Sequence, residues 1–176
     1  MTVPTDRPPG PMPDPQVTSD PRTLLEPRHF DGVVSTIADN NPGMTKEVAT
    51  RIACEGIKFT VAAAIFRDQA MAPSRVVDEG WHALILHTAT YAELCERFGG
   101  FVHHTPGYDP TFYDPTILDR SQELIRAAGF ESDRELWVGP DDRTFTVAAN
   151  CQHSKECAIR PMPTPQPPCN KPSQAA

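Results

Sequence analysis

The sequence predicts a mostly α-helical protein: a small helical bundle with an irregular C-terminal segment and disordered proline-rich tails. Apolar residues in the middle of the 176-residue chain recur at helical spacing, bordered by N-cap residues and glycine stops. The twenty prolines gather at the ends, with seven in residues 1–21 and six in residues 161–172. Because both ends are poor in apolar residues, burial cannot offset their chain entropy. We therefore expect disordered tails over 1–21 and 159–176 and a helical domain over 22–158.

The first two predicted helices are marked by the residues at which they begin. Pro27 suits the first position of a helix, and the helical spacing that follows continues until NNPG at 40–43 breaks it. Thr45 is a favourable N-cap for the second helix, which we expect to continue to about Arg67.

Two further helices are expected before the chain becomes irregular. The third begins with Ser74 as its N-cap and ends at Gly99, because glycine is common just after a helix. The fourth begins near Asp114 and ends at Gly129. The segment that follows contains two stretches predicted as short strands or extended loop, ELWVG (135–139) and RTFTVAA (143–149).

One acidic residue interrupts the apolar stripe of the second helix. Glu55 lies between Ile52 and Phe59 on the apolar face, so its carboxylate should point into the bundle. A buried unpaired charge is costly or becomes protonated, so Glu55 needs a partner there: a metal, a histidine, an arginine or a helix N-terminus. The alternative is that Glu55 lies at the edge of a different core face, formed by Ile57, Val61 and Ile65.

Four of the six histidines lie within 23 residues of one another. Asp78 and His82 are four residues apart, share one helix face and border the buried stripe, so we expect both to point inward. His87 falls on the opposite face and should be solvated. Neighbouring side chains of an extended segment point to opposite sides, so at most one of His103 and His104 should face His82.

This pattern of acids and histidines predicts a metal site. Two histidines and one carboxylate form a triad suited to iron(II) or, with an open position, to zinc. Asp78 is either a ligand or a partner that orients His82. The alternative is a hydrogen-bonded Asp–His network with a purely structural role. The predicted ligands are Glu55, Asp78, His82, His103 and His104.

A second candidate cluster lies near the C-terminus, where NCQHSKECAI contains Cys151, His153 and Cys157. Thiolates together with an imidazole suit zinc, although a closed structural site needs a fourth ligand. The alternatives are a flexible tail with incidental cysteines and a Cys151–Cys157 disulfide.

The stretch PSRVVDEGWHALILHTATYAELCERFGGFVHHTP (73–106) resembles the core block of the glycine-rich domain-containing-protein-like family, and GFESDRELW (129–137) resembles its small bacterial members. The resemblance implies a helical domain but no established reaction. Leu94 stands where the family pattern has phenylalanine, and the glycine-rich extension of the plant members is absent. The signature positions that the resemblance implies are Asp78, Trp81, His82, Tyr91, His103 and His104.

Composition excludes several functional classes. The net charge of −7 and the lack of a basic cluster predict no nucleic-acid partner. The longest apolar run, at 59–66, is far shorter than the roughly 20 residues of a membrane span, so we expect no membrane association. The odd count of five cysteines and the lack of an apolar leader indicate a cytoplasmic location. The phosphate-binding loop, dinucleotide-binding and serine-hydrolase motifs do not occur.

Two functional hypotheses follow. The first is a small soluble helical metal-binding protein that uses zinc or iron. If the ion keeps an open coordination position, the protein is expected to act as a metalloenzyme on an undetermined small-molecule substrate. The second is a non-enzymatic structural or interaction module with a buried Asp–His network. In either case the proline-rich tails are candidates for binding protein partners.

Overall fold

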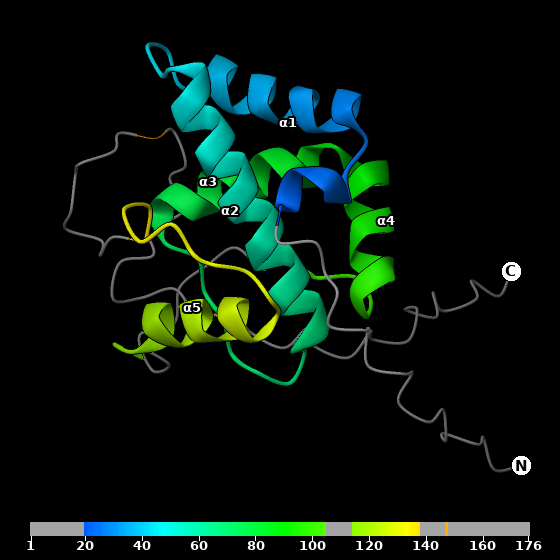
Figure 1. Ribbon diagram of the computed structural model, residues 1–176, viewed down its shortest axis with the longest axis vertical. Coiled ribbons are helices and arrows are strands. Elements are labelled where there is room, and N and C mark those ends of the chain that lie inside the picture. The colour runs from blue at the N-terminus through cyan, green and yellow to red at the C-terminus, as the bar shows by residue number, and fades with distance from the viewer. Residues whose placement is uncertain (1–19, 105–113, 138–146, 148–176) are drawn as a thin grey trace, which may run out of the picture.

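The computed structural model describes residues 20–104, 114–137 and 147. These residues form helices and no strand, which confirms the predicted mostly α fold (Figure 1). The predicted tails lie outside the described residues except for Asp20 and Pro21, and Glu135–Trp137 of the first predicted strand form a turn. The elements are η1 (Pro21–Leu24), α1 (Pro27–Asn40), α2 (Lys46–Ile65), α3 (Arg75–Leu86), α4 (Thr88–Phe98) and α5 (Ile117–Ala127).

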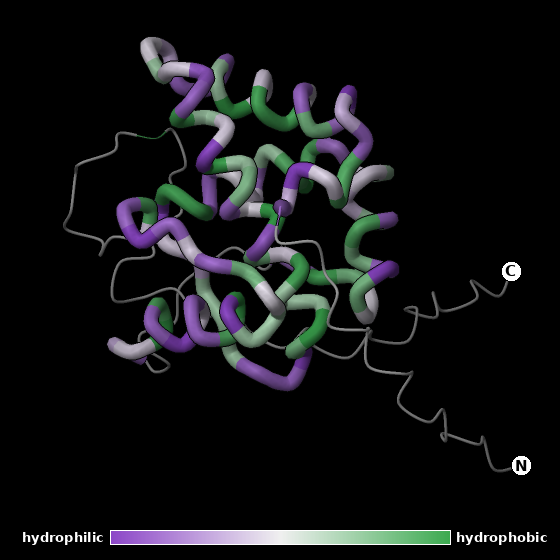
Figure 2. Tube along the Cα trace, viewed as in Figure 1, coloured by the Kyte–Doolittle hydropathy of each residue, from purple (hydrophilic) through white to green (hydrophobic). Residues whose placement is uncertain are grey.

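Helix α2 is the centre of the bundle. It contacts each of the other helices, and in Figure 1 it crosses the middle of the molecule with α1 above it and α5 below. Ile52 and Phe59 on one side and Ile57 and Val61 on another are all fully buried, so both apolar stripes of α2 belong to the core. The outer helix α1 instead alternates hydrophobic and hydrophilic residues around its turns (Figure 2).

The helix ends follow the capping signals in the sequence. Thr45 and Ser74 are the N-caps of α2 and α3, and each side chain accepts a hydrogen bond from a backbone N–H of the first turn. At the end of α5, Gly129 has a φ of 94°, and the Phe130 N–H donates to the Ile125 carbonyl at 3.2 Å. This pairing is the glycine stop predicted from the sequence.

The prediction of one long third helix is wrong, because the chain breaks at His87 into α3 and α4. The His87 ring is half-buried against α1, with Nε2 3.0 Å from the Thr36 hydroxyl oxygen, and is not solvated as expected. Gly32 makes room for it, since a Cβ there would lie 3.0 Å from the ring. The tertiary contact with α1 thus accompanies a break that no proline or glycine signals.

Helices α2 and α3 cross with their backbones in contact at two glycines. A Cβ atom on Gly56 would lie 2.6 Å from the carbonyl carbon of Gly80, and one on Gly80 would overlap the carbonyl oxygen of Ile52. Real Cβ atoms do not approach backbone atoms so closely, so only glycine fits at either position. Gly80 lies midway between Asp78 and His82, and the crossing therefore presses this turn of α3 against α2.

None of the helices in the described part of the chain has both the length and the apolar character required to cross a membrane.

We predict that Gly80→Ala lowers the free energy of unfolding by about 1–3 kcal/mol, because the added methyl group overpacks the crossing. The loss should occur even though alanine favours a helix over glycine by roughly 1 kcal/mol. Urea unfolding measures the change. Gly32→Ala is the matched control, because its Cβ would meet only the movable His87 ring, and it should change stability far less. Equal stabilities of the two variants would contradict backbone contact at Gly80.

Candidate metal centre

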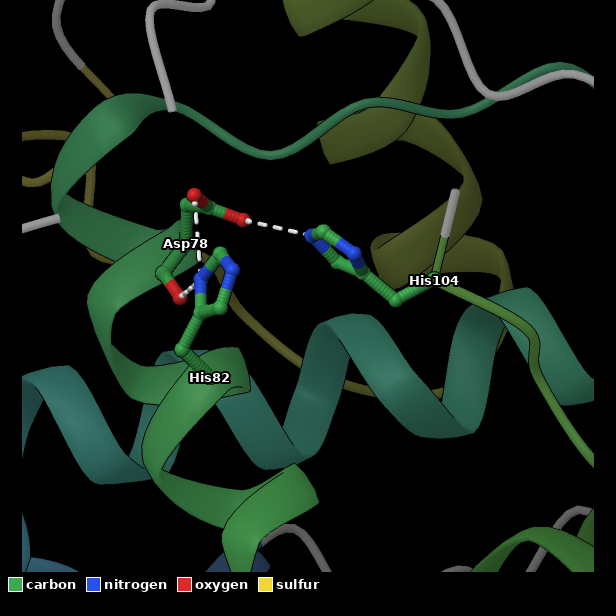
Figure 3. Close-up of side chains that lie close together, drawn as sticks. All are labelled: Asp78, His82 and His104. Carbon is green, nitrogen blue, oxygen red and sulfur yellow. Dashed lines mark hydrogen bonds and ion pairs between the residues drawn. The ribbon is translucent and has the colours of Figure 1, made fainter. Parts of the chain in front are cut away.

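Three of the five predicted ligands come together in the structure. One potential ligand atom each from Asp78, His82 and His104 lies within 4.8 Å of the other two. Figure 3 shows the Asp78 carboxylate directed towards both imidazole rings. Within the described residues, no other group of three histidines, cysteines or acids meets this spacing. These three residues are called the Asp78 cluster below.

Asp78 and His82 belong to one turn of α3. The Asp78 carboxylate is fully buried, and its Oδ2 lies 3.1 Å from His82 Nδ1. The same nitrogen is 2.8 Å from the backbone carbonyl oxygen of Asp78. Because a carbonyl oxygen only accepts hydrogen bonds, Nδ1 must carry the hydrogen. The lone pair of a neutral His82 ring is then on Nε2, where it is available to a metal ion.

His104 reaches the cluster from the segment that follows α4. Its Nε2 lies 3.9 Å from Asp78 Oδ1, and its ring centroid lies 4.5 Å from that of His82. His103, in contrast, is exposed and its ring contacts Phe101. The alternation expected for an extended segment is therefore present, with His104 turned inward and His103 outward.

The electrostatics of the cluster favour a bound positive charge. A nearby cation stabilises an ionised carboxylate buried as deeply as that of Asp78, because desolvation costs several kcal/mol. The hydrogen bond that the His82 ring donates to the Asp78 carboxylate raises the pKa of His82, and burial partly opposes this effect. Two kinds of cation suit this position, namely a proton on the imidazole or a metal ion shared by the three side chains.

The structure does not bring Glu55 into the Asp78 cluster. Its side chain is fully buried, as its position in the apolar stripe predicts. One carboxylate oxygen accepts from Lys58 Nζ at 2.5 Å and from the Asp133 N–H at 3.1 Å. The other accepts from Trp137 Nε1 at 2.7 Å. These donors compensate the charge of Glu55, and two of them come from a segment about 80 residues further along the chain.

The same segment is attached to α2 by an ion-pair group that the sequence did not signal. Arg51 donates to both carboxylate oxygens of Asp133, at 2.7 and 3.0 Å, and to Glu135 at 2.5 Å. Lys58 also donates to the Glu131 carbonyl oxygen. Arg51, Glu55 and Lys58 thus form a polar docking strip on α2, separate from the Asp78 cluster.

The second predicted cluster, Cys151, His153 and Cys157, lies outside the described residues. Of the two cysteines inside them, Cys95 is buried and Cys54 half-buried. Burial raises the pKa of Cys54 to about 11, which makes this thiol a poor nucleophile and a poor metal ligand.

Comparison with known proteins identifies the family. A model of the UCP032817-like family matches residues 22–110. The chain belongs to the UCP032817-like family. The resemblance to the glycine-rich domain-containing-protein-like family is therefore wrong, because the block that suggested it, residues 73–106, lies within the UCP032817-like match. That match contains α1 to α4 and the whole Asp78 cluster. Searches of curated proteins and of solved structures found no match.

We predict that Arg51→Met lowers the free energy of unfolding at about pH 7 by about 1 kcal/mol, the upper end for a partly exposed ion pair. Arg51 holds the pKa of Asp133 below its ordinary value of 3.8, so this stabilisation is complete above pH 3.8 and is lost as the pH falls through the lower folded-state pKa. The difference between wild type and variant in urea unfolding should therefore shrink at about pH 3.

Arg28→Met is the control, because the ion pair between Arg28 and Glu26 is far more exposed. It should leave stability unchanged at both pH values. A difference for Arg51→Met that stays constant down to about pH 3 would contradict the coupling to Asp133.

Proposed function

We propose that this chain is a small helical metal-binding protein in which Asp78, His82 and His104 hold one divalent ion, zinc or iron. The observation that carries the proposal is the convergence of two imidazoles on a fully buried carboxylate. Two histidines with one carboxylate are a common ligand set for both metals.

The spacing of the cluster fits an ion after a small contraction. Ligand atoms about 2.1 Å from a tetrahedral zinc ion lie roughly 3.4 Å from one another. One carboxylate oxygen and one nitrogen of each ring already lie within 4.8 Å of one another, about 1.4 Å more than this spacing at most. Binding through His82 Nε2 also requires the ring to turn from its Nδ1 contact with Asp78. The His82 side chain, 38% exposed, has room to make this adjustment.

Three protein ligands leave a coordination position for a further group. The exposure of His82 places the cluster at the protein surface, where that position is reachable by water. A divalent ion with an open position lowers the pKa of a bound water molecule and polarises substrate oxygen atoms. The cluster thus supports a metalloenzyme whose substrate is undetermined.

A second candidate function has its own supporting observation. The 3.1 Å contact between His82 and Asp78 and the raised pKa of His82 suit an imidazolium–carboxylate pair that needs no metal. In this case the cluster is a structural network and the chain is a non-enzymatic interaction module.

Several further proposals depend on the sequence alone. They are the helical domain over 22–158 between disordered tails, protein partners for these tails, a second metal cluster at Cys151, His153 and Cys157, a cytoplasmic location and the lack of a nucleic-acid partner.

We predict that the wild-type chain binds one Zn²⁺ or Fe²⁺ ion. Asp78→Asn and His104→Ala should each lower the affinity by about 100-fold or more, because the loss of a direct ligand should exceed the roughly 10–100-fold effect of losing an outer partner. Isothermal titration calorimetry and metal analysis of the purified protein measure affinity and stoichiometry. Where only weak binding remains, competition with a chelator extends the range.

His103→Ala is the matched control, because it removes a neighbouring imidazole that is exposed and turned away. It should leave the affinity unchanged. A wild-type chain that binds neither ion, while Asp78→Asn lowers the melting temperature, would support the structural network and overturn the metal site.

A further inference from the structure

A chain of buried hydrogen bonds links α3 to the segment that carries His104. The Trp81 indole N–H donates to the Tyr91 hydroxyl oxygen at 3.1 Å, and the Tyr91 hydroxyl donates to the Val102 carbonyl oxygen at 2.5 Å. Trp81 and Tyr91 are each only 2% exposed. Trp81 directly precedes His82, and Val102 is two residues before His104, so the chain begins and ends beside members of the Asp78 cluster.

Aromatic contacts reinforce the same connection. The Trp81 ring lies 4.7 Å, centroid to centroid, from the His104 ring. The Phe101 ring meets the Tyr91 ring edge-on at 5.2 Å. The segment 101–104 is not helical, so its position depends on such contacts from α3 and α4.

The Tyr91 hydroxyl remains a donor under ordinary conditions. Burial raises the pKa of Tyr91 above its ordinary value of 10.0, so the phenol keeps its proton at neutral pH. It therefore accepts from one element and donates to another at the same time, which a phenylalanine cannot do.

We propose that Tyr91 is a positioning residue of the metal site: its hydroxyl ties Val102 to Trp81 and thereby fixes His104 opposite Asp78 and His82. The inference rests on the proposed function, because it concerns the geometry of the ion-binding cluster. Tyr91 itself does not touch the ion. It acts through the backbone of the segment that bears one ligand.

The test uses Co²⁺ as a probe, because its visible absorption reports the geometry of its ligands. Tyr91→Phe should lower the Co²⁺ affinity of the full chain by about 10-fold, the lower end of the effect of an outer partner, and should alter the absorption bands. Titrations are performed at a temperature well below the melting temperature of each variant.

Ser121→Ala is the matched control for general loosening of the core. Its hydroxyl is also buried, accepts from the Ala72 N–H at 3.0 Å and donates to the Ile117 carbonyl oxygen at 2.8 Å, in a different part of the bundle. This variant should lose stability but keep the wild-type Co²⁺ affinity and spectrum.

The outcomes separate the two proposals. Wild-type binding with unchanged affinity and spectrum in Tyr91→Phe overturns the positioning role alone, as does an equal loss of affinity in Ser121→Ala. Absence of Co²⁺ binding by the wild-type chain overturns the metal site, and the positioning role with it. If Tyr91→Phe fails to fold, Phe101→Ala replaces it, because Phe101 is 39% exposed. This variant should lower the Co²⁺ affinity by less than Tyr91→Phe would. An unchanged affinity would overturn the positioning role.

Discussion

The backbone contact between α2 and α3 at Gly56 and Gly80 determines where the groups of the candidate site lie. At about 100° per residue, Asp78 and His82, each two residues from Gly80, lie on roughly the opposite side of α3 from the face that meets α2. With the two backbones in contact, the turn of α3 that contains Gly80 is pressed into the core. On that turn Asp78 is fully buried, while His82, one turn further along, remains partly exposed. The crossing thus fixes the position of the turn of α3 that carries both side chains, and the cluster lies on the far side of that turn.

The bundle contains two buried carboxylates whose charges are compensated in different ways. Glu55 is surrounded by an ammonium group, an indole N–H and a backbone N–H, all of which only donate hydrogen bonds. Asp78 faces two imidazoles, which can carry a proton but can also offer a lone pair. The surroundings of Glu55 therefore suit a permanent structural contact, and those of Asp78 suit an exchangeable cation. This difference is the physical reason for proposing the metal site at Asp78 and not at Glu55.

Local features of the chain could be predicted from the sequence, whereas long-range contacts could not. The caps at Thr45 and Ser74 and the burial of Glu55 follow from the nearest few residues, so spacing alone identifies them. The partners of Glu55 lie about 80 residues away, and no local pattern encodes that distance. The break at His87 likewise accompanies a contact with Thr36 on another helix. Within the candidate site, the i, i+4 spacing of Asp78 and His82 predicts their contact. The inward turn of His104, as opposed to His103, depends on how the chain leaves α4.

The most direct measurement of the central claim is an anomalous difference map from crystals of the full chain grown with Zn²⁺, recorded at the zinc absorption edge. If the Asp78 cluster binds the ion, one peak should lie about 2.0–2.2 Å from an Asp78 carboxylate oxygen and from one ring nitrogen each of His82 and His104. A map without a peak at this position, in which the His82–Asp78 ion pair persists unchanged, would contradict the account.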